Sequence, residues 1–176
     1  MDRFSALADQ PLAWEITAAH FIVAANELVT LEAAATPAGF SWSDSGSNWP
    51  VLLLYATAAE NLLKAIRIAQ GEPVTSGGAL SKYYISHNLP RYSTDAHVGL
   101  SPAEAEMLQV LRDVLEAGKY PAPTVPGKNP NAWRFSYPDD VHTVWSLLQR
   151  LDDALRHTGT KCLDPFEVAK LQKPRT

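Results

Sequence analysis

Apolar residues recur every three or four positions in four long segments of the chain, which is the period of a helix with a buried face. The first segment covers residues 11–35, has Pro11 in its first turn and is rich in alanine. Its buried stripe is predicted at Ile16, Ala19, Val23, Leu28 and Leu31. The second segment runs from about residue 48 to Gly71 and is the most apolar, so we predict a central helix there. Its buried stripe is predicted at Leu52, Tyr55, Ala59, Leu62 and Ile66.

Two further long helices follow the same rule. Ser101-Pro102-Ala103-Glu104 is a capping box with proline at the first helical position, and it opens a helix that ends at Gly118. The last helix begins at Tyr137-Pro138-Asp139-Asp140, and the two aspartates suit the positive end of a helix. Its apolar positions are Val141, Val144, Leu148, Leu151 and Leu155. A short helix is predicted over about residues 88–97.

The connecting segments contain glycine, serine and proline. Residues 72–86 are predicted as a loop, and four prolines exclude regular structure from residues 121–136. No run of alternating β-branched or aromatic residues predicts a strand. Four long helices and one short helix therefore predict an all-α fold, an antiparallel, up-and-down helical bundle. One further turn is predicted over residues 166–171.

Composition narrows the class of protein. A chain of 176 residues predicts one domain over residues 1–176, and 46% hydrophobic with 19% charged residues predicts a globular one. The net charge of −4 argues against strong non-specific nucleic-acid binding, although it leaves room for a local basic patch. No signal peptide and no apolar run near the roughly 20 residues that span a bilayer are recognised. A cytoplasmic protein without membrane contact is expected.

Motifs for metals and cofactors are missing from the sequence. None of the five histidines forms a His-x-x-x-His or Glu-x-x-His pair, and the single cysteine, Cys162, excludes an intrachain disulfide and a cysteine zinc cluster. Gly77-Gly78 lacks the Gly-Lys-Ser/Thr of a phosphate-binding loop and is interpreted as a turn. We therefore expect no metal and no cofactor.

Three charged residues share one face of the second helix. Glu60, Lys64 and Arg67 are spaced four and three positions apart, and Glu60 before Lys64 is the favourable order for a helical ion pair. Two interpretations stay open, a solvated stripe on the outside of the bundle or a polar strip that lines a groove or a dimer seam.

Arg91 and His97 form the candidate catalytic pair. Arginine and histidine side chains brought together can cleave RNA without metal, because the imidazole transfers protons and the guanidinium stabilises the phosphorane. The alternative is a spacing that arises by chance. Lys119, directly after the helix that ends at Gly118, either complements the helix dipole or joins Lys128 and Arg134 in an anion site.

The chain resembles the HEPN-like domain family over about residues 49–156. Residues 55–66, Tyr-Ala-Thr-Ala-Ala-Glu-Asn-Leu-Leu-Lys-Ala-Ile, look like its signature helix. His87-Asn88-Leu89 resembles its His-Asp-Leu motif, and Lys119-Tyr120-Pro121 resembles its Arg-Tyr-Pro motif. The three motifs occur in the order that the family shows.

The resemblance implies an α-helical bundle, commonly a homodimer and mostly prokaryotic, which suggests a bacterial protein. One branch of the family contains metal-independent ribonucleases of toxin and phage-defence systems with an Arg-x4-6-His motif. Another accompanies nucleotidyltransferases or binds nucleotides. The chain looks more like the second branch, because Tyr92 replaces the polar residue after the arginine and the Arg91–His97 pair follows the His-Asn-Leu motif.

Three functional hypotheses follow. The first is a non-catalytic module that binds a nucleotide, another phosphorylated ligand or a partner protein. Its ligand-binding residues would be Glu60, Lys64, Arg67, His87, Lys119 and Tyr120. The second is a metal-independent endoribonuclease that uses Arg91 and His97 on an RNA substrate. The third is a structural or antitoxin-like interaction subunit.

Overall fold

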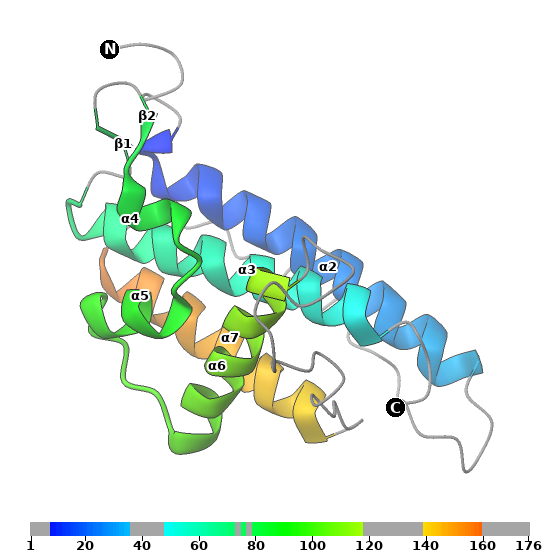
Figure 1. Cartoon of the computed structure of the whole chain (residues 1–176). Coiled ribbons are helices and arrows are strands. Elements are labelled where there is room, and N and C mark those ends of the chain that lie inside the picture. The colour runs from blue at the N-terminus through cyan, green and yellow to red at the C-terminus, as the bar shows by residue number, and fades with distance from the viewer. Residues whose placement is uncertain (1–7, 36–47, 73–74, 77–78, 118–138, 160–176) are drawn as a thin grey trace.

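The computed structural model of the protein describes residues 8–35, 48–72, 75–76, 79–117 and 139–159. This part of the chain is mostly helical, which confirms the all-α prediction (Figure 1). The described helices are α2 (Pro11–Ala35), α3 (Asn48–Ala69), α4 (Lys82–Ile85), α5 (Leu89–Asp95), α6 (Pro102–Ala117) and α7 (Asp139–His157). The observed bounds of the four long helices agree with the predicted ones to within about two residues.

Helix α3 lies at the centre, where it packs against α2, α5, α6 and α7 (Figure 1). The buried stripe predicted for this helix is confirmed, since its five side chains from Leu52 to Ile66 are all buried. Leu63 and Ala56, on other faces, are fully buried as well. A helix that is apolar on nearly every side is stable in water only when other elements surround it. The composition of α3 therefore sets its central place.

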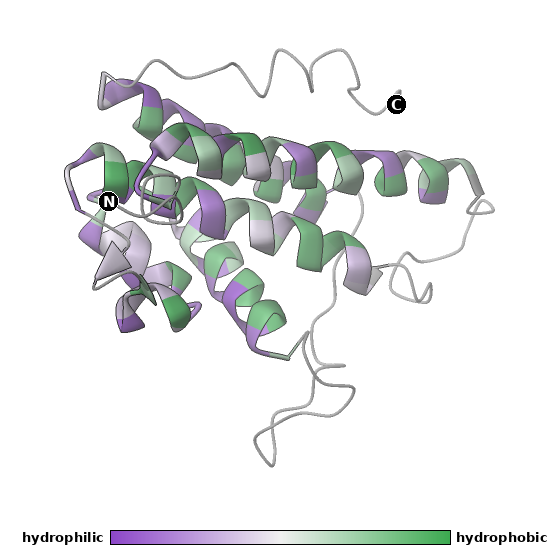
Figure 2. Ribbon diagram, turned by 90° about the horizontal axis from the view of Figure 1, so that it is seen from above, coloured by the Kyte–Doolittle hydropathy of each residue, from purple (hydrophilic) through white to green (hydrophobic). Residues whose placement is uncertain are grey.

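The predicted stripe of α2 is wrong. The face of α2 that packs on α3 carries Ala18, Ile22, Ala25 and Val29, whereas Ile16 and Leu31 are exposed. Green residues recur along the length of α2 in Figure 2. Apolar residues occur on nearly every side of this helix, so the helical period alone does not select the buried face. A polar contact helps to select it, because the hydroxyl of Tyr55 donates to Asn26 Oδ1 at 2.8 Å.

By length and composition alone, α2 also qualifies as a membrane-spanning segment over Pro11–Ala34, with 28% of its most apolar window buried. The sequence pattern predicted no such segment, because Glu15, Asn26 and Glu27 interrupt the apolar run. A buried helix of a water-soluble protein passes the same test, so this is weak evidence for a membrane span.

Helices α6 and α7 meet through a buried carboxylate. The predicted capping box is confirmed, since Ser101 N–H donates to Glu104 Oε2 at 2.8 Å and Glu104 N–H donates to Ser101 Oγ at 3.3 Å. From α7, Ser146 Oγ and Arg150 Nε donate to the same carboxylate at 2.8–3.0 Å. Burial raises the pKa of Glu104, but these donors outweigh it and lower the pKa from 4.5 to about 2. The carboxylate thus stays charged and ties α7 to the start of α6.

Residues 72–86, predicted as a loop, contain short regular elements. Strand β1 (Thr75–Ser76) pairs antiparallel with β2 (Ala79–Leu80), with Thr75 opposite Leu80, and α4 follows. Asp9 anchors this hairpin, because Thr75 Oγ1 donates to its carboxylate at 2.6 Å. The prediction that no strand occurs is therefore wrong. Two-residue strands are too short for an alternating pattern, although a Gly-Gly pair between them in the sequence favours a hairpin turn.

Several predicted features lie outside the described residues. They are Lys119 and Tyr120, Lys128 and Arg134, the proline-rich segment 121–136, Cys162 and the turn over residues 166–171.

Candidate functional site

An open cleft of about 570 Å³ lies where α3 and α7 end and where the chain passes from α5 to α6. Its polar side chains come from three different elements, and isoleucine, valine and alanine provide the apolar part of its lining. The lining residues are Ile66, Ala69, Gln70, Ala96, His97, Val98, Gly99, Arg150, Asp153, Ala154, His157 and Thr158. A volume of this size suits a small organic ligand.

Three helices end around this cleft, each with a residue of positive φ directly after its last turn. Gly71 (φ 92°) follows α3, Gly159 (φ 78°) follows α7, and His97 (φ 57°) follows α5. After α5, Val98 N–H donates to Ser93 O and His97 N–H donates to Thr94 O, both at 3.0 Å, which is the Schellman pattern. The same pattern ends α3 at Gly71.

His97 therefore stands at a position where glycine is the usual residue. A non-glycine side chain in this conformation costs about 1–2 kcal/mol. Its imidazole is exposed and lines the cleft, and no hydrogen bond holds it within the described part of the chain. Backbone strain that local contacts do not repay is characteristic of functional positions. His97 is thus the residue of the cleft that folding alone explains least.

Two side chains of α3 hold the turn that carries His97. Arg67 Nη1 donates to Asp95 O at 2.7 Å, and Gln70 Nε2 donates to Ala96 O at 2.9 Å. Both acceptors are carbonyls at the end of α5 that lack a partner within the helix. Arg67, predicted as a ligand-binding residue, thereby acts in the structure as an anchor for the wall of the cleft.

Helix α7 supplies the other polar groups of the cleft. Arg150 is about half exposed. Its Nε binds the Glu104 carboxylate, and this contact holds the guanidinium in place. His157 Nδ1 lies 2.6 Å from Asp153 O, and because a carbonyl only accepts, Nδ1 carries the proton there. That assignment leaves Nε2 of His157 as the nitrogen available to a ligand.

The arrangement combines cationic and apolar groups at a negatively polarised place. The ends of α3, α5 and α7 concentrate partial negative charge, which favours arginine and histidine side chains there. Asp153 adds a carboxylate, so the cleft is unsuited to a bare anion. A ligand with a phosphate for Arg150 and the imidazoles, and with a flat apolar part for the floor, fits this pattern better.

A second polar cluster lies deeper in the fold. Glu60 accepts from Lys64 Nζ at 2.8 Å and lies 3.0 Å from His87 Nδ1, and Lys64 also sits 4.9 Å from the ring centre of Trp14. Glu60 and Lys64 are 5% and 7% exposed, so they do not form the solvated stripe that was one interpretation of the sequence. Their mutual pairing satisfies a buried charge of each sign.

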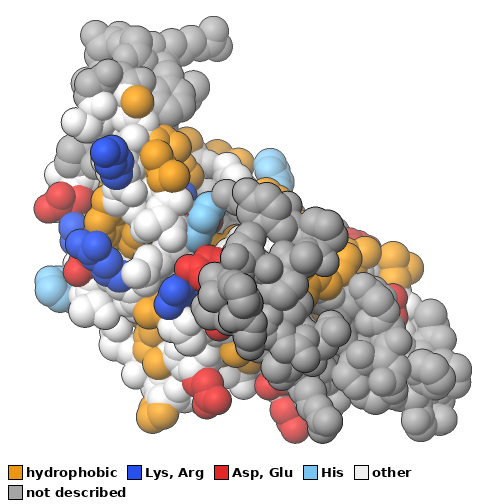
Figure 3. All heavy atoms as spheres, in the orientation of Figure 1, with side chains coloured by type: hydrophobic (Ala, Val, Ile, Leu, Met, Phe, Trp, Pro, Cys, Tyr) orange, Lys and Arg blue, Asp and Glu red, His pale blue; other side chains and the backbone are white. Residues whose placement is uncertain are grey.

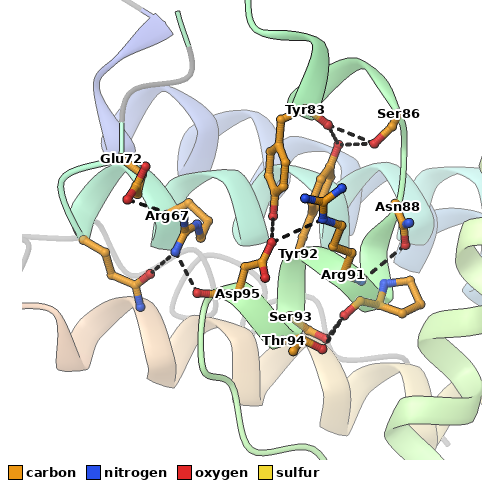
Figure 4. Close-up of polar contacts among 12 residues, drawn as sticks. Arg67, Glu72, Tyr83, Ser86, Asn88, Arg91, Tyr92, Ser93, Thr94 and Asp95 are labelled. Atoms are coloured by element: carbon orange, nitrogen blue, oxygen red, sulfur yellow. Dashed lines mark hydrogen bonds and ion pairs between the residues drawn. The ribbon is translucent and has the colours of Figure 1, made fainter.

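Arg91 belongs to a third group of side chains, on the face of α4 and α5 where Lys and Arg side chains gather in Figure 3. Figure 4 shows the guanidinium beside Tyr83 and Asp95, 4.9 Å from the ring centre and 3.5 Å from Asp95 Oδ2. The hydroxyl of Tyr83 also donates to Asp95, and it contributes most to lowering the pKa of that carboxyl. Arg91 is not among the residues that line the cleft beside His97.

The structure thus distributes the predicted site residues over three places. Glu60, Lys64 and His87 meet in the buried cluster, Arg67 braces the cleft, and Arg91 and His97 occupy different surroundings on α5 and after it. Arg150 and His157 were missed, because on a helix with a regular apolar stripe they resemble ordinary basic residues near a C-terminus. Within the described residues, no three His, Cys, Asp or Glu side chains are placed to hold a metal ion.

Comparison of the chain with protein-family models, with curated proteins and with solved structures finds no match.

Proposed function

We propose that this protein is a non-catalytic binding module, a cytoplasmic HEPN-like up-and-down helical bundle, that holds a nucleotide in the cleft at the ends of α3, α5 and α7. The observation that carries the proposal is the position of His97. Its strained backbone places in the cleft, which Arg150 and His157 also line, an imidazole that has no hydrogen-bond partner among the described residues. The resemblance of residues 55–66, 87–89 and 119–121 to HEPN-like motifs supports the fold part of the proposal.

The chemistry of the cleft favours a nucleotide over simpler ligands. Arg150 and the imidazolium forms of the two histidines offer hydrogen-bond donors to a phosphate, and charge-assisted bonds of this type are the stronger ones. The Asp153 carboxylate, which also lines the cleft, offers acceptors to the amino and imino groups of a base. Inorganic phosphate would meet Asp153 and the negative helix ends without the compensating contacts of a base.

A thermal-shift series tests this proposal. Ligand that binds only the folded state raises the unfolding temperature, so nucleoside monophosphates should raise it more than either inorganic phosphate or the matching nucleosides. His157→Ala removes one donor and should weaken nucleotide binding about tenfold or more. His142→Ala is the matched control, since His142 is an exposed histidine of the same helix and does not line the cleft. Equal shifts in all three proteins would contradict the site.

A metal-independent ribonuclease is the second candidate function. The observation in its favour is that the cleft is lined by two histidines, His97 and His157, and two imidazoles can divide the roles of general base and general acid. RNA cleavage in excess EDTA should then be lost in both His97→Ala and His157→Ala. If Arg91→Ala also abolished cleavage, Arg91 would join the pair as the sequence spacing suggests. Equal background with all variants would leave the binding module.

A further inference from the structure

The outer face of α2 carries three of the four large apolar side chains that are exposed among the described residues. Leu31 is 63% exposed, Ile16 is 36% exposed and Leu12 is 37% exposed, although the opposite face of the helix is buried against α3. A 25-residue helix is roughly 37 Å long, so this face extends along much of the molecule (Figure 2). Exposed apolar surface of this extent is typical of an interaction site.

The order of residues on this face is symmetric about the point between Val23 and Ala24. Ile16 and Leu31 lie equally far from that point, and so do Ala13 and Ala34. His20 and Glu27 form a third equidistant pair, and both are exposed. At 100° per residue these positions share one side of the helix, opposite the buried Ala18, Ile22 and Val29.

We propose that the outer face of α2 is a self-complementary surface on which a second copy of this chain packs antiparallel, with a two-fold axis passing between Val23 and Ala24. A two-fold contact requires that each residue meets the one equally far on the other side of the axis. Ile16 of one copy then packs on Leu31 of the other, and His20 faces Glu27 twice. Apolar side chains on this face of one copy then meet apolar side chains of the other copy. Glu27, the only acidic residue on the face, meets His20 of the other copy.

Charge and size favour this occupant over other partners. A lipid surface satisfies neither His20 nor Glu27 at the middle of the face, whereas a second copy satisfies both at once. Alanines at positions 13, 24 and 34 allow the helix axes to approach closely. One helix pair buries an area at the low end of specific interfaces, so dissociation is expected in the micromolar range.

Sedimentation over micromolar to hundreds of micromolar protein tests the surface, with circular dichroism confirming that each variant is folded. Wild type should dimerise, and Leu31→Glu should raise the dissociation constant at least tenfold. His20→Glu should also weaken the dimer by setting two carboxylates against each other. Adding Glu27→Lys to His20→Glu should restore it, because each new carboxylate then meets a cation.

Disulfide trapping tests the register in a Cys162→Ser background. Ala24→Cys should cross-link on oxidation, because both copies of this position lie beside the axis. Ala33→Cys should not, since its two copies are roughly 28 Å apart along the helices. A strict monomer, a dimer indifferent to Leu31→Glu, or cross-linking at 33 instead of 24 would overturn the proposal. So would a wild-type monomer that sediments with phosphatidylglycerol vesicles, which would assign the face to a membrane.

Discussion

Two histidines flank α5, and both have left-handed backbone conformations, His87 with φ 51° and His97 with φ 57°. His87 lies in the interior side of the fold, where its Nδ1 contacts both oxygens of Glu60 at 3.0 and 3.1 Å. His97 lines an open cleft without such a contact among the described residues. The backbone strain is similar at the two histidines. Among the described residues, only the side chain of His87 makes a contact that stabilises the folded state and so offsets this strain.

This difference separates a histidine that the fold uses from one that we propose contacts a ligand. The strain at His87 is compensated by its hydrogen-bond contact with Glu60, which joins the segment before α5 to α3, so folding accounts for the residue. The strain at His97 is uncompensated within the described part of the chain, and glycine stands at the equivalent positions after α3 and α7. The proposed ligand site would account for a histidine there.

The largest expected effect is a loss of stability at the buried Glu60–Lys64 pair, which lies beside His87. Lys64→Met leaves the buried Glu60 without its lysine, and breaking a buried ion pair costs about 3–5 kcal/mol. Urea unfolding measures the loss. The double variant Glu60→Leu with Lys64→Met removes both charges and should recover most of the stability. A single variant as stable as wild type would mean that the pair is solvated.

Acid titration tests the contact between the Glu104 carboxylate and Arg150. The pKa of Glu104 is lowered from 4.5 to about 2, so its contribution to stability is complete above pH 4.5 and is lost as the pH falls through about 2. A shift of this size corresponds to roughly 3 kcal/mol at most. Glu104→Gln should remove this part of the pH dependence, measured by urea unfolding between pH 2 and 6. If Glu104→Gln left the dependence of stability on pH unchanged, the Glu104 carboxylate would not contribute to stability.

The two histidines themselves give the next contrast. His87→Ala removes a charge-assisted contact to Glu60 and keeps a non-glycine residue at positive φ, so it should destabilise the fold by about 1.5–3 kcal/mol. Nucleotide affinity at a temperature where the variant is folded should not change. A loss of affinity without a loss of stability would move the binding site to the buried cluster.

The smallest expected effect has the opposite sign. His97→Gly relieves the left-handed strain and should stabilise the fold by about 1 kcal/mol in urea unfolding. Gly71→Ala is the mirror control, because it creates the same strain after α3 and should destabilise the fold by a similar amount. If His97→Gly were destabilising, the imidazole would have a structural partner and the comparison with His87 would fail.

Most helices follow from residue patterns because local signals and burial agree there. The capping box at Ser101–Glu104 and the regular stripe of α7 each specify one answer. The capping box is confirmed, and four of the five predicted α7 positions are buried, while Val141 is half-buried. In α2 these signals disagree. Because apolar residues lie on nearly every side of α2, their spacing does not determine which face is buried. Ile16 and Leu31 were therefore assigned to the wrong side.

The cleft was less accessible to sequence reasoning, because it depends on how helix ends meet. His97 was recognised through its spacing from Arg91, yet the structure places it with Arg150 and His157, more than 50 positions further along the chain. No periodicity relates residues that meet only through tertiary packing. A usable signal existed in the turn after α5, where a histidine occupies the position that favours glycine.

The central claim is that the imidazole of His97 serves a ligand and not the fold. Calorimetric titration of a nucleoside monophosphate into wild type and His97→Gly, both at a temperature where they are fully folded, tests it most directly. We predict that the glycine variant binds at least tenfold more weakly although it is the more stable protein. Equal affinity in the two proteins would contradict the account.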